Sequence, residues 1–325
     1  MDHHNDVARD DLEPRDAVRR HAGSTMMFDT VICDLDGVVW LEGEPIGESV
    51  AAIAGWREMG HRVLFVTNNS TVSSTEHAAR LAAIGIEAHG DVISSSDAAA
   101  AMIAAGESVM VLGGPGITDA VTERGAQLVD PNAVMVDSSA GDRLDAVESV
   151  DVVVVGLDRR FDYQRLSAAA AALRSGARFI ATNEDPALPT PTGPMPGAGS
   201  IVAAVAAASG RTPVVAGKPH QAIVAVIHER LGPQFDPARA LVVGDRLGTD
   251  GALAARLGCR FALVRDVAAV ATRHDDDDEE IASQGGDEHA NDAVDAVADD
   301  VCPAVWLTAS TVHEVMVACR VRACD

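Results

Sequence analysis

The stretch Val31-Ile-Cys-Asp-Leu-Asp-Gly-Val-Val39 places two carboxylates at the end of an apolar run. The apolar residues suit a strand buried in a parallel sheet, where an ionised carboxylate is costly unless a cation or hydrogen-bond donors meet it. Asp34 and Asp36 share one face of a regular strand, and Gly37 allows a sharp turn directly after them. We therefore expect this strand end to hold a cation, a phosphate, or both.

Length and charge limit what the protein can be. At 325 residues the chain exceeds one average domain, and we expect two moderate domains. The formal net charge of -24 argues against nucleic acid and anionic membrane surfaces as partners, since both would meet a repelling field. Lys218 is the only lysine among 25 basic residues, and such an acidic, lysine-poor composition predicts a halophilic source.

The cysteines and the apolar segments indicate the compartment. Five cysteines, an odd number without a Cys-x-x-Cys pair, fit reduced intracellular thiols better than a disulfide framework or a zinc site. No run is long and apolar enough for a membrane span, and the N-terminus lacks the pattern of a signal peptide. We expect a cytoplasmic protein.

From Phe28 onward, short apolar strands alternate with alanine-rich helices, which predicts an α/β fold with doubly wound parallel sheets. The expected strands are 30–35, 62–67, 108–112, 152–155, 178–182, 213–216, 240–244, 260–264 and 303–307. The expected helices include 48–59, one that Ser73 or Ser74 caps and that runs to Ile84, and 116–124, 163–174 and 200–208. Residues 1–26 are expected to be a disordered extension and 272–300 an acidic disordered insertion.

Polar residues of complementary chemistry follow four of these strands. Because the carboxyl ends of parallel strands meet at one edge of a sheet, we expect them to share one pocket. The carboxylates suit Mg²⁺, whereas a threonine hydroxyl and an ammonium group suit phosphate oxygens, so the set predicts phosphoryl transfer. The four groups are Asp34 with Asp36, Thr67-Asn68-Asn69, Lys218, and Asp245 with Asp250.

The same segments resemble the four motifs of the haloacid dehalogenase superfamily. The segments are Asp34-Leu-Asp36-Gly37-Val38, Thr67-Asn-Asn, Gly217-Lys218-Pro219 and Gly244-Asp245-Arg-Leu-Gly-Thr-Asp250. Val155-Gly-Leu-Asp158, Ala181-Thr-Asn183-Glu-Asp185-Pro and Pro196-Gly-Ala-Gly-Ser200 further resemble its subclass IIA, which includes NagD-like, pyridoxal phosphate and phosphoglycolate phosphatases. The resemblance covers about 28–265, with a weaker tail at 303–320, and implies a Rossmann-like core with an inserted α/β cap of the C2a type.

The resemblance implies a role for each matching residue. Asp34 would be the nucleophile that forms an aspartyl-phosphate, and Asp36 the general acid and base. Mg²⁺ would bind Asp34, the backbone carbonyl of Asp36, and Asp245, with support from Asp250. The expected contacts to substrate or phosphate are Gly37, Thr67, Asn68, Asn69, Lys218 and, from a specificity loop, Asp185.

The chain between Thr67 and Lys218 is far longer than the βα units that continue a sheet, and we expect it to contain a second domain. The predicted cap covers 87–211, and the predicted core covers 27–86 and 212–325. The cap would close over the site, exclude water and select the leaving group. The resemblance also implies a homo-oligomer, with a dimer through the cap as the expected form.

The prediction is a Mg²⁺-dependent phosphomonoesterase acting on a small soluble phosphate ester. Two alternatives stay open. A phosphotransferase or phosphomutase would share the aspartyl-phosphate step, and a receiver-like phospho-acceptor would also combine aspartates, a threonine and a lysine on a parallel sheet. Gly113-Gly-Pro-Gly116 lacks the lysine of a phosphate-binding loop and is interpreted as a strand-to-helix turn.

Overall fold

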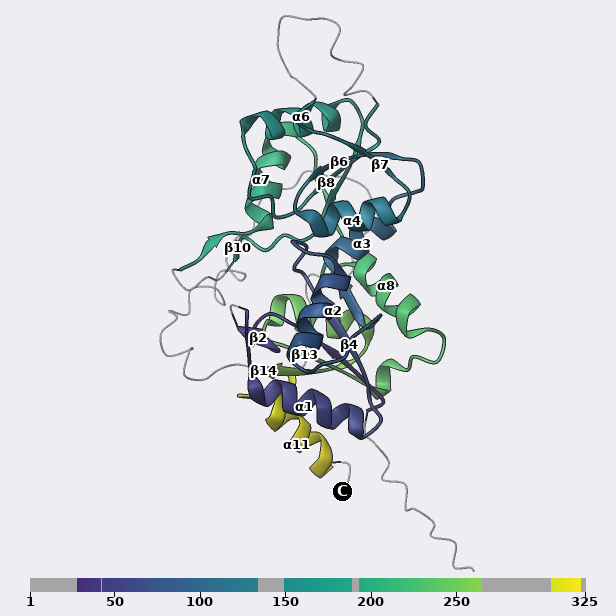
Figure 1. The fold of residues 1–325 in the computed structure, drawn as a ribbon, viewed down its shortest axis with the longest axis vertical. Helices are drawn as coiled ribbons and strands as arrows, with labels where there is room; N and C mark the ends of the chain where they lie inside the picture. The colour runs from purple at the N-terminus through teal and green to yellow at the C-terminus, as the bar shows by residue number, and fades with distance from the viewer. Residues whose placement is uncertain (1–27, 42, 134–148, 189–192, 265–304, 323–325) are drawn as a thin grey trace, which may run out of the picture.

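Two parallel sheets, each in its own lobe, lie along the longest axis of the molecule (Figure 1). The computed structural model describes residues 28–41, 43–133, 149–188, 193–264 and 305–322. The predicted α/β class with helices covering parallel sheets is confirmed. The predictions for 1–26 and 272–300 lie outside the described residues.

The larger sheet has six strands in the order β15-β14-β13-β1-β4-β5, and every neighbouring pair is parallel. From β1 the chain continues on one side to β4 and β5 and later returns to β13 on the other side of β1, which creates a crevice at the carboxyl ends of β1 and β13. In chain order the strands are β1 (Thr30–Cys33), β4 (Arg62–Thr67), β5 (Val92–Ser94), β13 (Ala240–Gly244), β14 (Arg260–Val264) and β15 (Val305–Ala309).

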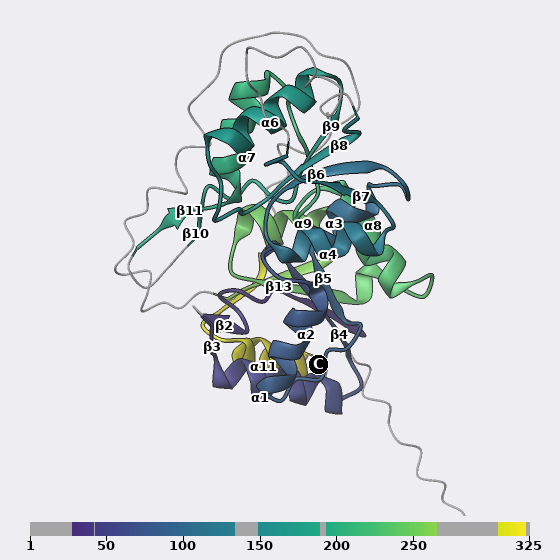
Figure 2. The ribbon, with the colours of Figure 1, turned by 45° about the horizontal axis from the view of Figure 1, so that its top comes forward.

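Helices cover both faces of this sheet, because its strands are apolar on both sides. One face packs against α1 (Gly47–Glu58), α2 (Ser74–Ala83) and α11 (Val312–Arg322), and Figures 1 and 2 show α1 and α11 side by side. The other face packs against α3 (Ser95–Ala101), α8 (Gln221–Leu231) and α9 (Ala252–Leu257). Ser73 caps α2 by accepting a hydrogen bond from the Glu76 backbone, as one of the two predicted caps.

The smaller sheet has five parallel strands in the order β12-β9-β8-β6-β7. They are β6 (Ser108–Leu112), β7 (Gln127–Val129), β8 (Val152–Val155), β9 (Arg178–Ala181) and β12 (Val214–Val215). One face packs against α6 (Tyr163–Arg174) and α7 (Ala198–Ser209). On the other face, α4 (Pro115–Glu123) joins α3 and α8 in a single hydrophobic cluster that reaches the larger sheet.

Short elements complete the described chain. Two antiparallel hairpins are formed by β2 (Trp40–Leu41) with β3 (Glu44–Pro45), and by β10 (Ala187–Leu188) with β11 (Met195–Pro196). A 3₁₀ turn covers Pro237–Arg239, and a π-helical turn covers Leu247–Gly251 just after β13. The first hairpin follows the Asp34 strand directly, so the chain folds back over the end of β1.

Sheet membership differs from the predicted domain boundaries at both ends. The boundary at 87 falls before β5, yet β5 pairs with β4 in the larger sheet, so the chain enters the smaller sheet only after α3. The boundary at 212 falls before β12, yet β12 pairs with β9 in the smaller sheet. Strand β5 has only three residues and no periodic signal, and the strand predicted at 213–216 gave no indication of which sheet it joins.

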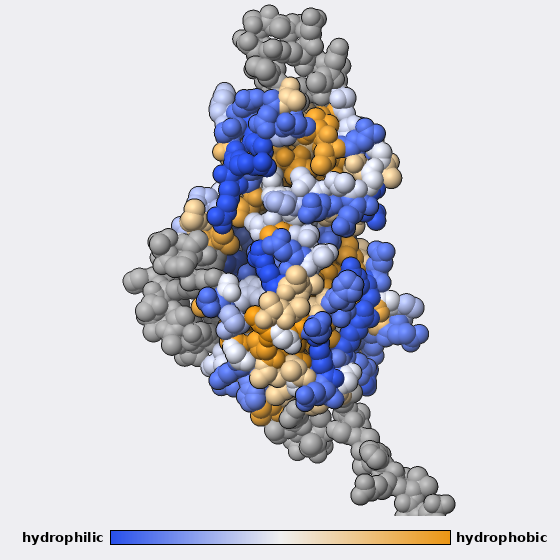
Figure 3. Space-filling view, in the orientation of Figure 1, coloured by the Kyte–Doolittle hydropathy of each residue, from blue (hydrophilic) through white to orange (hydrophobic). Residues whose placement is uncertain are grey.

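The described surface shows scattered apolar side chains. Hydrophilic residues dominate the face seen in Figure 3, with apolar groups in smaller patches between them. The exposed large apolar residues include Leu41, Leu128, Tyr163, Met195 and Val214, which come from five different elements. No helix in the described ranges has the length and apolar character needed to cross a membrane.

The turn from β6 into α4 packs closely against the loop after β4. A Cβ added to Gly116 would lie 2.2 Å from the Val72 carbonyl oxygen, and one added to Gly114 would lie 2.8 Å from that of Thr71. The Gly116 N–H donates to the Thr71 carbonyl at 3.3 Å. The glycines of this predicted strand-to-helix turn therefore permit backbone contact between the lobes.

We expect Gly116→Ala to lower the free energy of unfolding by about 1–3 kcal/mol, because the added methyl group meets a backbone carbonyl that cannot rotate away. Urea unfolding followed by circular dichroism measures this. Gly47→Ala is the matched control, since a Cβ there meets no atom within 4 Å. Equal stability of the two variants would contradict the close contact.

Candidate active site

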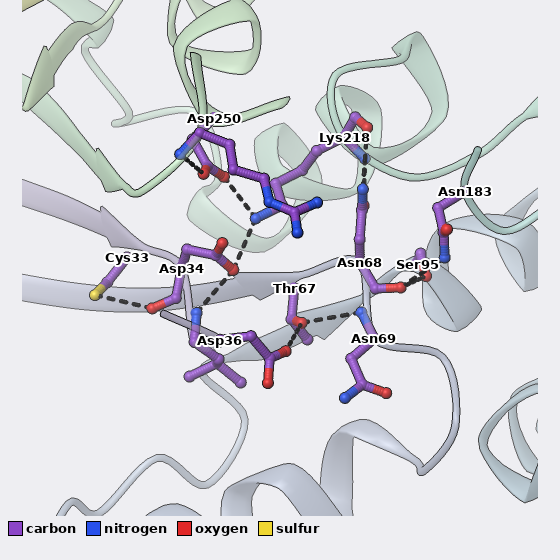
Figure 4. Close-up of polar contacts among 12 residues, drawn as sticks. Cys33, Asp34, Asp36, Thr67, Asn68, Asn69, Ser95, Asn183, Lys218 and Asp250 are labelled. Carbon is purple, nitrogen blue, oxygen red and sulfur yellow. Dashed lines mark hydrogen bonds and ion pairs between the residues drawn. The ribbon is translucent and has the colours of Figure 1, made fainter. Parts of the chain in front are cut away.

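The ends of β1, β4 and β13 bring the predicted site residues to one edge of the larger sheet (Figure 4). Cys33, the last residue of β1, pairs with Val243 on one side and Phe65 on the other, so the residues that follow these three strands are neighbours. The Asp34 N–H continues the ladder by donating to Val243 at 2.9 Å. Lys218 reaches the same edge from the loop between β12 and α8.

A buried ion-pair triad lies at the centre of this edge. The Lys218 Nζ lies 2.8 Å from Asp34 Oδ1 and 2.6 Å from Asp250 Oδ1. The ammonium group is 3% exposed and Asp250 is 1% exposed, so water screens these contacts little. The Leu35 N–H also donates to Asp34 Oδ1, at 2.7 Å. Among the described residues no donor contacts Oδ2 of Asp34, which leaves that oxygen for other chemistry.

The ionisation of these groups follows from burial and mutual charge. Burial, and then the Asp250 carboxylate, raise the pKa of Asp34 well above its usual value. The same two causes raise the pKa of Asp245 to about 6. Burial alone would lower the pKa of Lys218, but Asp250 and Asp34 outweigh it and raise that pKa. The cluster carries more carboxylates than Lys218 can neutralise.

The donor set fits a hard divalent cation. Asp34, Asp245 and Asp250 each offer a carboxylate oxygen, and these oxygens all lie within 4.8 Å of one another. Oxygen-only donors and excess negative charge suit Mg²⁺. Gly37 makes room for this cluster: its φ is +81°, and a Cβ there would lie 2.4 Å from Asp245 Oδ2.

Asp36 stands apart from the triad. Its Oδ1 accepts a hydrogen bond from the Trp40 indole N–H at 2.9 Å, and its Oδ2 accepts one from the Thr67 hydroxyl at 3.3 Å. Thr67 in turn accepts from the Asn69 N–H at 3.0 Å. The two aspartates of the first motif therefore have separate partners, although they are two residues apart.

Three residues predicted to bind phosphate are engaged within the protein. The Asn68 side chain accepts from the Lys218 N–H at 2.7 Å and donates to the Lys218 carbonyl at 3.2 Å, which fixes the backbone that carries the ammonium group. Asn69 Oδ1 accepts from the N–H and hydroxyl of Thr71, and the Gly37 N–H donates to the Trp40 carbonyl. The Asn68 and Asn69 side chains and the Gly37 N–H thus support the backbone around the site, and we call them the site frame.

A loop of the smaller lobe lies at the rim of the site. Asp185 Oδ2 accepts from Asn68 Nδ2 at 3.4 Å, and Asp185 Oδ1 lies 3.4 Å from Arg246 Nη1. The Asn183 side chain donates to the Asn68 carbonyl at 2.9 Å, and Glu184 lies 3.0 Å from His220 Nε2. The predicted specificity loop is thus held against three loops of the larger lobe.

Sequence reasoning did not select Trp40, Arg246 or Ser95 as members of the site. Trp40 looks like an ordinary core residue, and only its spacing of four from Asp36 could have suggested the contact. Arg246 stands inside the fourth motif, beside Asp245. Ser95 donates to the Asn68 carbonyl at 2.7 Å and is far from every motif in the chain, so no local signal identifies it.

Comparison with known families follows the same segments. The family model described as haloacid dehalogenase-like hydrolase matches residues 31–127, and a second, described as HAD-hydrolase-like, matches residues 215–302. The first match includes the Asp34 and Thr67 motifs, and the second includes the Lys218 and Asp245 motifs.

Individual relatives agree with the family models. An acid sugar phosphatase of Staphylococcus saprophyticus is 36% identical over 227 residues, which cover 69% of this chain and 81% of that protein. A D-glycerol 3-phosphate phosphatase of Mycobacterium tuberculosis is 39% identical over 70% of this chain, which spans 61% of that protein. The crystal structure of glycerol phosphate phosphatase from M. tuberculosis with magnesium has a TM-score of 0.62 at 36% identity, and covers 73% of this chain and 68% of that one.

We expect Lys218→Met to lower the free energy of unfolding at pH 8 by about 3–5 kcal/mol, because it leaves buried carboxylates without their counter-charge. The loss should be smaller at pH 5, where protonation of Asp34, whose pKa is raised by burial, relieves the repulsion. Urea unfolding in EDTA at both pH values measures this. The double variant Lys218→Met/Asp250→Asn should recover part of the loss, and an unchanged stability at pH 8 would contradict the triad.

Proposed function

This chain belongs to the haloacid dehalogenase-like hydrolases, in their NagD-like phosphatase branch, and we propose that it hydrolyses small phosphate monoesters through an aspartyl-phosphate with Mg²⁺. The observation that carries this proposal is the arrangement around Asp34. One of its oxygens is held by Lys218 and the Leu35 N–H, while the other meets no donor from the described residues. A carboxylate fixed in this way is oriented for nucleophilic attack.

The first step transfers the phosphoryl group to the protein. Asp34 Oδ2 attacks phosphorus, the new bond to the aspartate oxygen forms, and the bond to the ester oxygen breaks in line with it. Asp36 donates a proton to the departing ester oxygen, which leaves as an alcohol. Lys218 offsets the charge that gathers between the carboxylate and the phosphoryl oxygens.

The second step returns the protein to its starting state. Asp36, now ionised, accepts a proton from a water molecule that attacks phosphorus, and the bond to Asp34 breaks. Inorganic phosphate and the Asp34 carboxylate are the products. The Asp36 carboxylate is hydrogen-bonded to Trp40 and Thr67 and not to Lys218. It can therefore gain and lose a proton without breaking the ion pairs of Lys218.

Asp34, Asp245, Asp250 and the Asp36 carbonyl would hold Mg²⁺ in this proposal. The three carboxylates fit the ion, because they are crowded, oxygen-donating and only partly neutralised by Lys218. When bound, Mg²⁺ supplies positive charge that reduces repulsion between the carboxylate and the phosphate and stabilises the transition state.

We infer that the leaving group is chosen by the smaller lobe, acting as the cap. The loop from Asn183 to Asp185 is the part of that lobe with contacts to the site frame. Relatives are named for sugar and glycerol phosphates, which supports the proposal of a small soluble ester as the substrate. The cytoplasmic location, the halophilic source and the dimer stay predictions.

We expect Asp34→Asn to abolish turnover of p-nitrophenyl phosphate, with a loss of at least about 10³-fold, because an amide is a poor nucleophile. Asp36→Asn should lower kcat by about 10²–10⁴-fold, since general acid–base catalysis contributes that much. Release of p-nitrophenolate and of phosphate measures both. Asp119→Asn, at an exposed position of α4, is the control for charge loss. Near-normal activity of Asp34→Asn would refute the assignment.

The stabilisation by Mg²⁺ should depend on pH. The folded-state pKa of Asp245 is about 6, above its usual 3.8, so the metal-free protein loses stability as pH rises toward 6 and Asp245 ionises beside Asp250. Saturating Mg²⁺ should therefore raise Tm more at pH 8 than at pH 5. Differential scanning fluorimetry with Mg²⁺ or EDTA measures this, and Asp245→Asn should reduce the difference. Equal Tm shifts at both pH values would argue against this metal site.

A further inference from the structure

The turn after β1 brings the Trp40 ring back to Asp36. The Val39 N–H donates to the Leu35 carbonyl at 2.8 Å, and the Gly37 N–H donates to the Trp40 carbonyl at 2.8 Å. This closed turn places the indole N–H 2.9 Å from Asp36 Oδ1. Trp40 is 7% exposed, so its N–H needs a protein acceptor, and that acceptor is a site carboxylate and not a backbone carbonyl.

The indole ring is held from its other side by the helix after β4. The rings of Trp40 and His77 are stacked, with centroids 6.3 Å apart and an interplanar angle of 16°. His77 lies on α2, is fully buried, and its Nε2 lies 3.2 Å from the Asn69 carbonyl. The ring is therefore held between the β1 turn and α2. Figure 4 shows Asp36 beside Thr67, and Thr67 beside Asn69.

The two hydrogen-bond donors to Asp36 place different constraints on the protonation of its two oxygens. An aspartate carboxylate rotates easily about its last torsion, so a donor on each oxygen is needed to fix its plane. The indole N–H can only donate, whereas the Thr67 hydroxyl can donate or accept. Protonation of Oδ1 would weaken it as an acceptor for the Trp40 N–H, whereas Oδ2 can carry a proton and keep its hydrogen bond to Thr67.

We propose that Trp40 is a positioning residue that fixes the Asp36 carboxyl and makes Oδ2 the oxygen that gives and takes the proton. This inference rests on the proposed function, in which Asp36 protonates the leaving group. Among the described residues no hydrogen bond joins the Trp40 side chain to Lys218 or to the three clustered carboxylates, so we expect Trp40→Phe to leave the nucleophile and the cation site in place.

The test compares Trp40→Phe with the intact protein on phenyl phosphate and p-nitrophenyl phosphate in Mg²⁺. The value of kcat/KM reports steps up to the departure of the leaving group, and phenolate needs a proton more than p-nitrophenolate does. We expect kcat/KM to fall about tenfold or more for phenyl phosphate, the size expected for losing one hydrogen bond to a charged group. For p-nitrophenyl phosphate the fall should be less than about threefold.

Trp56→Phe is the matched control, because it removes another buried indole from the same hydrophobic cluster. It should leave the ratio of the two kcat/KM values unchanged. If Trp40→Phe does not fold, β-(3-benzothienyl)alanine at position 40 removes only the N–H, and the same change in ratio is expected. Equal losses on both substrates, or none, would overturn the inference.

The outcome for Asp36→Asn separates this inference from the proposed function. If Asp36→Asn shows the leaving-group dependence and Trp40→Phe does not, the proposed function stands and the role of Trp40 is wrong. If neither variant shows it, or the intact protein hydrolyses neither ester, the assignment of Asp36 as the proton donor fails, and the inference fails with it.

Discussion

The buried Lys218 ammonium group, paired with Asp34 and Asp250, is the interaction on which the rest of the site depends. One positive charge among crowded carboxylates leaves a net negative site with little water to screen it. That imbalance creates the demand for a cation, which would also offset the repulsion between these carboxylates and a phosphate ester. The Asn68 side chain bonds both the backbone N–H and the backbone carbonyl of Lys218. It therefore fixes the backbone from which the ammonium group extends.

The topology explains how residues from four distant segments share this edge. The order in which the chain adds strands to the larger sheet reverses at β1, so β4 lies on one side of β1 and β13 on the other. The polar residues follow these strands. The smaller lobe is inserted between β5 and α8 and meets the larger one through α3, α4 and the glycine turn at Gly116. The lobes therefore share a hydrophobic cluster, and the loop of Asn183 lies where it can contact a bound ester.

The parts of the fold with strong apolar periods were predictable from sequence, and the parts built by isolated contacts were not. Strands β4 and β13 and helix α6 were predicted to the residue, because the strands are apolar runs and the helix is an alanine-rich segment with clear ends. Strand β5 has three residues and no period, so the sequence did not indicate that it pairs with β4 in the larger sheet. The motif residues were predicted to share one edge of the sheet, and they do. The hydrogen bonds from Lys218 to Asn68 and from Trp40 to Asp36 depend on pairings that no spacing rule specifies.

The proposed mechanism requires the phosphoryl group to pass through Asp34. Its most direct test is to quench the Asp36→Asn protein with acid during turnover, reduce it with borohydride, which converts an aspartyl-phosphate to homoserine, and sequence the peptides by mass spectrometry. We expect homoserine at position 34, and only when substrate is present. Homoserine at position 245 or 250, or none while phosphate is still released, would contradict it.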